Sequence, residues 1–342
     1  MKLFLQAFGA SAFVIWFAVI FAGCGGGESV VVSDNGHKLY VAQTLDTVAR
    51  IRKYTQGSGA VAAPANLLSA GTAMALESST RLWIAGSSLN GGTNQVVVIN
   101  PVTDSLVGVA NNVGQGPVSL AFALLTNPPR AYVASRASGS LSVLNMATLA
   151  SITTVGLGAN TVPSGVAVLN SGAGPTVFVT LAGTDELAMI NGTTNAILNR
   201  FPVGDQPSAV AVKPSGSEVW VTNQKGNSIS ILETQNYTPV TTITGIVAPS
   251  AIVFSNSLNV AFVASATSAT TGVVQVIDTL AYTVLKTINV GVGPNALAHS
   301  QNGYFLYSMN EGGNVTQIDA QAWKVVATVL PGGPVRAGVI VP

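Results

Sequence analysis

The chain has 342 residues, of which 48% are hydrophobic and 8% are charged, and its formal net charge is +1. Disorder requires low hydrophobicity and high net charge, so this composition excludes a disordered chain. It also disfavours nucleic-acid binding, because the sequence has no Lys- or Arg-rich run that could neutralise phosphates. The single cysteine, Cys24, excludes an internal disulfide.

Residues 1–23 predict a secretory signal peptide, because a positive start precedes an apolar stretch and then small residues before Cys24. The four residues that end at Cys24, FAGC, resemble the lipobox of bacterial lipoproteins. That resemblance implies cleavage before Cys24, acylation of its thiol, and attachment to a membrane of the cell envelope, facing the periplasm or the exterior. Residues 24–28 would form a Gly-rich tether. Two alternatives stay open: an uncleaved transmembrane anchor, for which the stretch is marginal, and a buried structural cysteine.

Residues 29–342 repeat with a period in the forties. Each repeat has a short apolar run with an aromatic or bulky residue, and its seven copies begin 42 to 49 residues apart at Leu39, Leu82, Ala131, Val177, Val219, Ala261 and Phe305. A second run follows and ends in a polar residue at Asn100, Asn145, Asn191, Glu233, Asp278 and Asp319. A turn with glycine and then a proline, such as Pro207 or Pro249, begins another apolar run.

Each repeat therefore contains four strand-sized runs separated by turn residues, while helix signals are nearly absent. Four short strands in about 40–45 residues are the pattern of one propeller blade. Blades stack radially, because a single blade cannot bury both of its faces. We therefore predict an all-β fold, a seven-bladed β-propeller of four-stranded antiparallel blades, over residues 29–342.

One repeat also carries a family resemblance. Residues 219–245, VWVTNQKGNSISILETQNYTPVTTITG, resemble the YVTN-type β-propeller repeat found in YncE-like and surface-layer-associated proteins. The resemblance covers nearly all of the chain after the tether, and it implies the same propeller fold.

The two ends of the chain offer competing strands for the innermost position of the first blade. Residues 29–33 lead through an Asp-Asn-Gly turn into the run at Leu39, as an innermost strand should. Residues 337–341 have the same apolar pattern at the other end. We expect residues 29–33 to fill the position. Either arrangement brings the two termini together and closes the ring.

Side chains that recur in every blade are better explained by structure than by chemistry. The Asn or Asp that ends each third strand is expected to hydrogen-bond nearby backbone and to start the turn into the outer strand. The aromatic residue of each second strand is expected to pack between neighbouring blades. The sequence has no HExxH motif, no CxxC pair and no GxSxG motif, and it has no helix that could open a dinucleotide site. It therefore predicts no metal site and no cofactor.

The titratable residues that fall on or beside predicted innermost strands are Glu77, Lys213 and His299, with Arg336 as a further one at the C-terminal end. The first three are the candidates for a channel site. For His299 we expect a polar group that lines the channel and is solvated there, rather than a metal ligand. A hydrolase resembling the seven-bladed lactonases would need a channel cluster of His, Arg and Glu, and these groups come from different blades. A redox subunit would need cofactor ligands that the sequence lacks. Both remain alternatives to a protein without catalysis.

The loops between second and third strands, and those that lead into each blade, are predicted to share one face. They are rich in Ser, Thr, Asn and Gly, and their charges include the candidate binding residues Arg136, Asp185, Glu186, Lys225 and Glu311. Loops on a rigid scaffold tend to carry binding residues, although for any single charge a solvated connector is the alternative. We expect a non-catalytic lipoprotein whose propeller is a binding platform for an unidentified protein or envelope component.

Overall fold

A computed structural model describes residues 38–45, 48–55, 58–62, 68–88, 94–172, 174–329 and 335–341. The regular elements within these ranges are β-strands, so the expected all-β fold is confirmed. None of the described residues belongs to a helix that could cross a membrane. Cys24, His37, residues 29–33 and the predicted signal peptide and tether lie outside the described residues.

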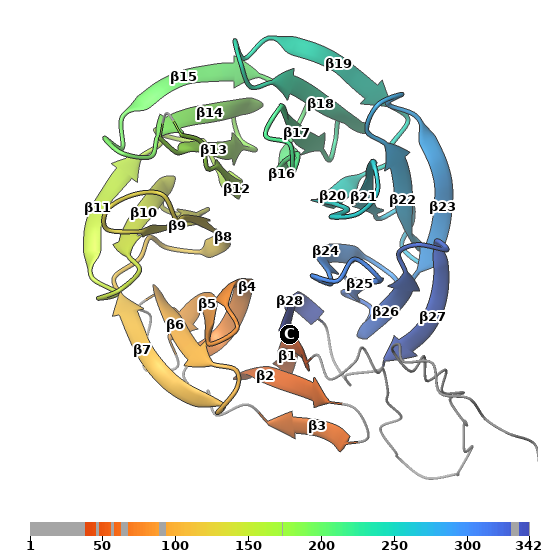
Figure 1. Ribbon diagram of the computed structural model, residues 1–342, viewed down its shortest axis with the longest axis horizontal. Coiled ribbons are helices and arrows are strands. Elements are labelled where there is room, and N and C mark those ends of the chain that lie inside the picture. Colours follow the sequence, from red (N-terminus) through yellow and green to blue (C-terminus); the bar gives the residue numbers. More distant parts are fainter. Residues whose placement is uncertain are drawn as a thin grey trace, which may run out of the picture.

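The strands form seven four-stranded sheets arranged as the blades of a propeller (Figure 1). The inner strands are β4 (Leu68–Ser78), β8 (Pro117–Ala123), β12 (Pro163–Leu169), β16 (Pro207–Val212), β20 (Pro249–Phe254), β24 (Pro294–His299) and β28 (Val335–Val341). The second strands are β5 (Arg81–Ser88), β9 (Arg130–Ser135), β13 (Thr176–Leu181), β17 (Glu218–Asn223), β21 (Val260–Ser265), β25 (Phe305–Asn310) and β1 (Lys38–Leu45).

The third strands are β6 (Asn94–Asn100), β10 (Ser140–Asn145), β14 (Glu186–Asn191), β18 (Ser228–Glu233), β22 (Gly272–Asp278), β26 (Asn314–Asp319) and β2 (Val48–Thr55). The outer strands are β7 (Ser105–Asn111), β11 (Ser151–Gly156), β15 (Ile197–Pro202), β19 (Pro239–Thr244), β23 (Val284–Val290), β27 (Lys324–Val329) and β3 (Ser58–Ala62). Neighbouring strands within each sheet pair antiparallel, as expected.

Six of the sheets consist of consecutive strands, from β4–β7 to β24–β27, and the seventh joins the two ends of the chain. In this sheet β28 is the inner strand and pairs with β1, with Lys38 opposite Val341. β28 also contacts the inner strands β24 and β4 on either side of it, so the ring closes through β28. Our expectation that residues 29–33 would fill this position is therefore wrong, because the C-terminal strand occupies it.

A repeated hydrogen bond explains why β28 fits between its neighbours. The second residue of an inner strand donates to the carbonyl of the first residue of the next inner strand, as from Ser164 to Pro207 (2.6 Å), Ser208 to Pro249 (2.7 Å) and Ser250 to Pro294 (2.5 Å). Asn295 Nδ2 makes the corresponding bond to the carbonyl of Val335 at 3.0 Å. Val335 thus stands where five of the other six sheets have a proline.

The ring has two faces. The upper face holds the loops between second and third strands and those that lead into inner strands, which are residues 112–116, 136–139, 157–162, 182–185, 203–206, 224–227, 245–248, 266–271, 291–293 and 311–313. The lower face holds the turns between inner and second strands and between third and outer strands, which are residues 79–80, 101–104, 124–129, 146–150, 170–172, 174–175, 192–196, 213–217, 234–238, 255–259, 279–283, 300–304 and 320–323. Every inner strand therefore runs from the upper to the lower face.

Aromatic residues of the second strands form the core between sheets, as expected. The fully buried ones are Trp83, Tyr132, Phe178, Trp220 and Phe262. The ring of Trp220 packs edge-on against Phe254 of the next sheet, with centroids 5.4 Å apart, and Trp83 packs similarly on Phe122 at 5.6 Å. The second and third strands are buried along nearly their whole length because neighbouring sheets cover both of their faces.

The polar residue that ends each third strand bonds the backbone of the following turn, as expected. Asn145 Oδ1 accepts the N–H groups of Ala147 and Thr148 at 2.8 and 3.1 Å. The same bonds form at Asn100, Asn191, Glu233, Asp278 and Asp319. The backbone donors hold the pKa of Asp278 below its usual range. These six side chains therefore shape turns.

The same turns carry a residue of positive φ whose side chain packs on the preceding sheet. Positive φ is uncommon for large side chains, yet φ lies between 53° and 61° at Leu149, Tyr237, Tyr282 and Trp323. The ring centroids of Tyr282 and Trp220 are 5.9 Å apart, and the ring centroids of Tyr237 and Phe178 are 6.2 Å apart. Contact with the neighbouring sheet holds these residues in place, so the turns join adjacent sheets.

Candidate functional site

The five predicted binding residues lie on or beside the upper face, but they do not converge. Arg136, Lys225 and Glu311 belong to loops of three different sheets, while Asp185 and Glu186 belong to a fourth. They are therefore spread around the ring rather than gathered at one point. Among the described residues, no group of three or more His, Cys, Asp and Glu side chains could hold a metal ion.

Hydrogen bonds fix these loops on the ring. The Arg136 N–H donates to the Gly116 carbonyl at 2.8 Å, and the Glu311 N–H donates to the Gly293 carbonyl at 2.9 Å. Asp185 uses its side chain in the same way, because its Oδ1 accepts the N–H of Gln206 in the next sheet at 2.8 Å. Each loop is thus bonded to a second loop that leads into an inner strand.

The charges of the upper face are of both signs and differ in their surroundings. Arg136 and Lys225 are exposed. Glu186 instead pairs with Arg200 at 3.0 Å. Glu311 Oε1 accepts a hydrogen bond from the side-chain amide of Asn295, on inner strand β24, at 3.4 Å. This face therefore presents fixed loops with separate positive and negative groups.

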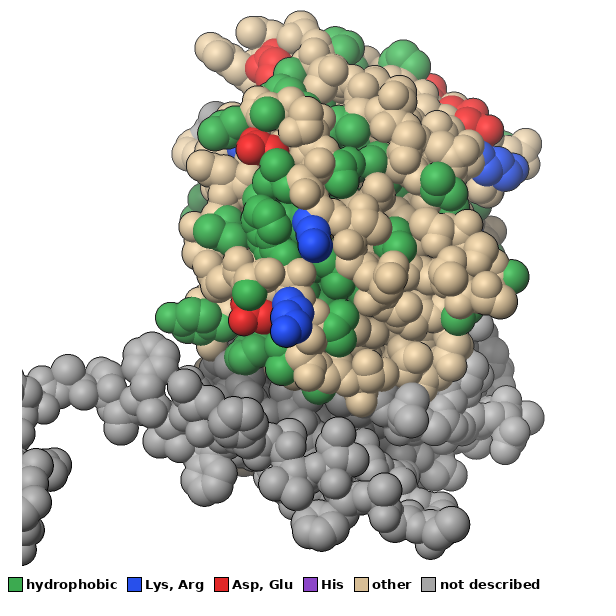
Figure 2. Space-filling view, turned by 90° about the vertical axis from the view of Figure 1, so that its right-hand side faces the viewer, with side chains coloured by type: hydrophobic (Ala, Val, Ile, Leu, Met, Phe, Trp, Pro, Cys, Tyr) green, Lys and Arg blue, Asp and Glu red, His purple; other side chains and the backbone are tan. Residues whose placement is uncertain are grey.

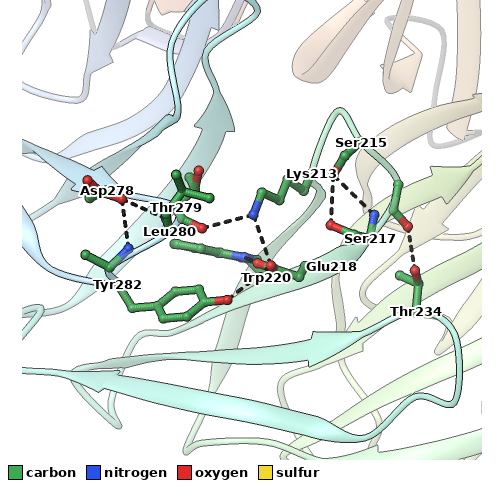
Figure 3. A network of polar contacts seen from close by, with 12 residues as sticks. Lys213, Ser215, Ser217, Glu218, Trp220, Thr234, Asp278, Thr279, Leu280 and Tyr282 are labelled. Carbon is green, nitrogen blue, oxygen red and sulfur yellow. Dashed lines mark hydrogen bonds and ion pairs between the residues drawn. The ribbon is translucent and has the colours of Figure 1, made fainter.

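Lys213 follows β16 in a turn of the lower face and belongs to a polar network between two sheets (Figure 3). Its Nζ donates to Glu218 Oε1 at 3.0 Å and to the Thr279 carbonyl of the next sheet at 2.9 Å. Glu218, which is 8% exposed, also accepts the Trp220 indole N–H at 2.7 Å and the Tyr282 hydroxyl at 3.1 Å. Burial and the charge of Glu218 raise the pKa of Tyr282. The expected channel position of Lys213 is therefore wrong, because this side chain links sheets.

Glu77 belongs to a similar network around Trp83, in which the acidic and the basic residue have exchanged positions relative to Lys213 and Glu218. It lies near the end of inner strand β4, and its Oε2 accepts the Trp83 indole N–H at 2.5 Å. Arg81 at the start of β5 lies 3.4 Å from the Glu77 carboxylate, and its guanidinium lies over the Trp83 ring at 5.4 Å from the centroid. The acid thus comes from the inner strand and the base from the second strand, whereas Lys213 and Glu218 have the opposite order. Glu77 is bonded to an indole rather than placed in the channel.

His299 ends β24 and packs between two sheets. Its ring lies 5.7 Å from that of Phe262 in the preceding sheet. Both ring nitrogens are buried without a hydrogen-bond partner, and burial lowers the pKa of the imidazole below its ordinary value of 6.5. The sixth position of other inner strands is apolar, namely Phe122, Val168, Val212 and Phe254. The expectation of a solvated channel histidine is therefore wrong.

A cleft of about 740 Å³ opens on the lower face between the sheets β12–β15 and β16–β19. Its polar lining includes Asn170, Thr193, Ser215 and Gln235, and Tyr237 supplies an aromatic wall. Lys213 also lines it, although its ammonium group is bonded as described above. No Asp, Glu or His is among its lining residues. The cleft can hold a small neutral polar molecule, but it offers no acid–base pair.

Sequence reasoning missed the charged residues that begin second strands, Arg81, Arg130 and Glu218. Arg130 Nη1 donates to the carbonyls of Gly192 and Thr193 in the next sheet at 2.7 and 2.8 Å. A signal was present, because each of these residues stands two positions before the aromatic residue of its strand. Residues i and i+2 of a strand share a side, so the charge lies beside the buried ring.

No protein-family model matches the sequence, and no curated protein matches it. Solved structures share the fold. Hydrazine synthase of Kuenenia stuttgartiensis is 18% identical, with a TM-score of 0.65, over 78% of this chain and 88% of that chain. A putative 6-phosphogluconolactonase of Bacteroides fragilis is 12% identical, with a TM-score of 0.72, over 92% and 100% of the two chains. A periplasmic gluconolactonase of Pseudomonas aeruginosa is 15% identical, with a TM-score of 0.68, over 87% and 97%.

At these identities the likeness shows the fold alone, and the narrower resemblance to YVTN-type repeats stays an expectation. Fold does not determine function, because propellers of one architecture carry different sites. The chain is a β-propeller protein with four-stranded blades.

Proposed function

We propose that this protein is a non-catalytic platform of the cell envelope, anchored through Cys24, which binds a partner protein on its upper face. The observation that carries the proposal is the placement of the candidate catalytic groups. Lys213 and Glu77 are engaged in hydrogen bonds with Glu218, Thr279 and Trp83, and His299 packs against an aromatic ring. Lys213 and Glu77 therefore have structural tasks that account for their presence, and both ring nitrogens of His299 are buried.

The upper face supports protein binding in two ways. Its loops are bonded to one another and rest on a ring of paired strands, so little conformational entropy is lost when a partner binds. Its exposed cations Arg136 and Lys225 share this face with the exposed carboxylates of Asp185 and Glu311. Separate charges of both signs favour a protein surface over a polyanion, and they contribute to specificity and association rate.

A photo-crosslinking experiment on the anchored, full-length protein tests the proposal. A crosslinking amino acid is placed at Lys225 on the upper face or, as matched control, at Lys286, which is an exposed lysine on β23. We expect one discrete product crosslinked to a partner protein from Lys225 and no product crosslinked to a protein from Lys286. The double variant Arg136→Glu with Lys225→Glu should slow association, because rim charges act mainly on the association rate. Products from Lys286 alone would contradict the proposal.

The membrane anchor has its own test. Cys24→Ala should leave the propeller folded but release it from membranes, because the only acylation site is lost. Cell fractionation with a carbonate wash measures this, and circular dichroism of the released protein reports the fold. If the variant stays in the membrane pellet, the lipobox interpretation is wrong.

A lactone hydrolase is the alternative function, favoured by the shared fold with proteins described as a gluconolactonase and a putative 6-phosphogluconolactonase. A positioned acid or base contributes typically 10²–10⁴-fold to a rate, so even a modest enzyme is measurable against the spontaneous reaction. The purified protein is assayed with glucono-δ-lactone and with its 6-phosphate. Turnover above the buffer rate that disappears in His299→Ala would replace the platform proposal.

A further inference from the structure

The outer strands carry a feature that repeats in six sheets and that neither the fold nor the upper face uses. In each of these sheets the pairing of third and outer strand skips one residue of the outer strand, near its beginning. The skipped residues are Val107, Ile152, Leu198, Val240, Leu285 and Val326. All six are aliphatic, and they are between 39% and 57% exposed.

A bulge on an edge strand is expected, because it blunts pairing with other sheets. That task does not require an apolar side chain, and a charged or polar one would perform it better. Exposing six aliphatic residues in equivalent positions is therefore a separate property of the surface. We call these six residues the bulge ring.

The bulge ring belongs to a broader asymmetry of the surface. Outer strands begin at the lower face, so the bulge ring lies along its rim. The lower-face turns add exposed apolar side chains at Val102, Leu124, Leu125, Leu280 and Tyr304, which are 52% to 66% exposed. Of the large hydrophobic side chains exposed in the described residues, all but Val247 lie on the lower face or at the adjoining ends of outer strands. Figure 2 looks onto β23 and its neighbours and shows hydrophobic side chains gathered mainly toward one side of the rim.

The chain reaches the propeller at this same face. β1 is a second strand, and second strands run from the lower to the upper face, so Lys38 opens β1 at the lower face, opposite Val341. Thirteen residues, 25–37, lie between Cys24 and Lys38. At up to about 3.3–3.6 Å per residue, this length lets the lower face lie directly on the surface to which Cys24 is attached.

We propose that the lower face of the propeller rests on the lipid bilayer, with the bulge ring and the apolar turns at the boundary between headgroups and acyl chains. This rests on the proposed anchor at Cys24, and it leaves the upper face turned toward partners. Apolar surface gains free energy on leaving water for this region. At the rim, Lys286 follows Leu285 and Lys324 lies two residues before Val326. Long cationic side chains in these places can reach the phosphate groups of lipids.

Site-specific quenching tests this orientation. Cys24 is the only cysteine of the chain, and acylation blocks its thiol, so one introduced cysteine is the only reactive thiol of the anchored protein. Leu285→Cys and Leu198→Cys place a fluorophore at two separate points of the bulge ring, and Lys225→Cys is the matched control on the upper face. The labelled proteins are reconstituted in vesicles of phosphatidylethanolamine and phosphatidylglycerol that carry a quencher at a shallow acyl position.

We expect quenching at both bulge-ring positions to be several times that at Lys225→Cys. Quenching no greater at the bulge ring than at the control, in protein that floats with the vesicles, overturns the orientation while leaving the anchor intact. Protection of the bulge-ring labels from aqueous iodide without lipid quenching would show that a second copy of this chain covers this face, and it also overturns the proposal. The unsubstituted protein is treated with the fluorophore in parallel. Labelling of its Cys24, together with loss of flotation, would identify a failure of the anchor itself and overturn both proposals.

Discussion

The two networks around Trp83 and Trp220 predict that the charges of Lys213 and Glu218 can be exchanged together but not singly. Lys213→Glu alone places a second carboxylate beside Glu218 and removes the cation bonded to it. Glu218→Arg alone leaves the Trp220 indole N–H without its acceptor and sets two cations together. Both side chains are at most 13% exposed, and removing one partner of a buried pair costs about 3–5 kcal/mol. Each single variant is expected to lose that amount.

The double variant, Lys213→Glu with Glu218→Arg, reproduces the order of charges that Glu77 and Arg81 already have. A carboxylate at the end of the inner strand would accept the indole N–H, and a guanidinium at the start of the second strand would lie over the ring, as around Trp83. The Tyr282 hydroxyl would lose its acceptor, so a residual loss of about 1–2 kcal/mol is expected. Because the two single losses together far exceed this residual loss, the substitutions should be coupled by about 4 kcal/mol or more.

Urea unfolding followed by tryptophan fluorescence and circular dichroism measures this coupling through a double-mutant cycle. Lys286→Glu, an exposed substitution on β23, is the control and should change stability by less than about 0.5 kcal/mol. If the losses of the two single variants simply add in the double variant, the equivalence of the two networks is refuted.

Three other changes probe the packing between sheets. His299→Phe should raise stability at pH 7 by about 1 kcal/mol, because it removes two buried nitrogens without partners and keeps an aromatic ring on Phe262. The pKa of His299 is lowered in the folded protein, so the unfolded chain takes up a proton first as the pH falls below 6.5. The stability of the wild type should therefore decline more steeply in that range than the stability of the variant, as measured by denaturant titrations. Ser208→Ala should cost about 1 kcal/mol in urea unfolding through loss of the bond to the Pro249 carbonyl; an unchanged midpoint would show that this bond contributes nothing. Removal of residues 335–342 should lower the melting temperature in calorimetry, because β28 contacts β24, β1 and β4, and an unchanged value would mean that ring closure does not stabilise the fold.

Much of the fold could be predicted from local sequence because each blade repeats the same short-range pattern. Asn145 could be assigned to a turn from its place after an apolar run, since its partners are the N–H groups of the next residues. Trp220 could be assigned to the core because an aromatic residue recurs in the short apolar run of each second strand. Both assignments depend only on neighbours in the chain.

The candidate site was less accessible from sequence. Lys213 finds one acceptor 66 residues away, in the Thr279 carbonyl, and His299 meets Phe262 across a sheet interface. Position on or beside an innermost strand suggested a channel for both residues. The direction of their side chains depends on which sheet stands next to their own, and a repeat pattern does not state that.

What the sequence by itself determined is therefore the repeating unit: four strands, their turns, and an aromatic residue between sheets, all set by alternation and by turn residues over a few positions. Only the tertiary structure decided which end of the chain closes the ring, what surrounds Lys213, Glu77 and His299, and the gathering of exposed aliphatic residues on the lower face. Both chain ends carry an apolar strand pattern, and strand pairing between them is a contact over just more than 300 residues, from Lys38 to Val341. Such contacts depend on the order of sheets in space, which becomes defined only when the ring is complete.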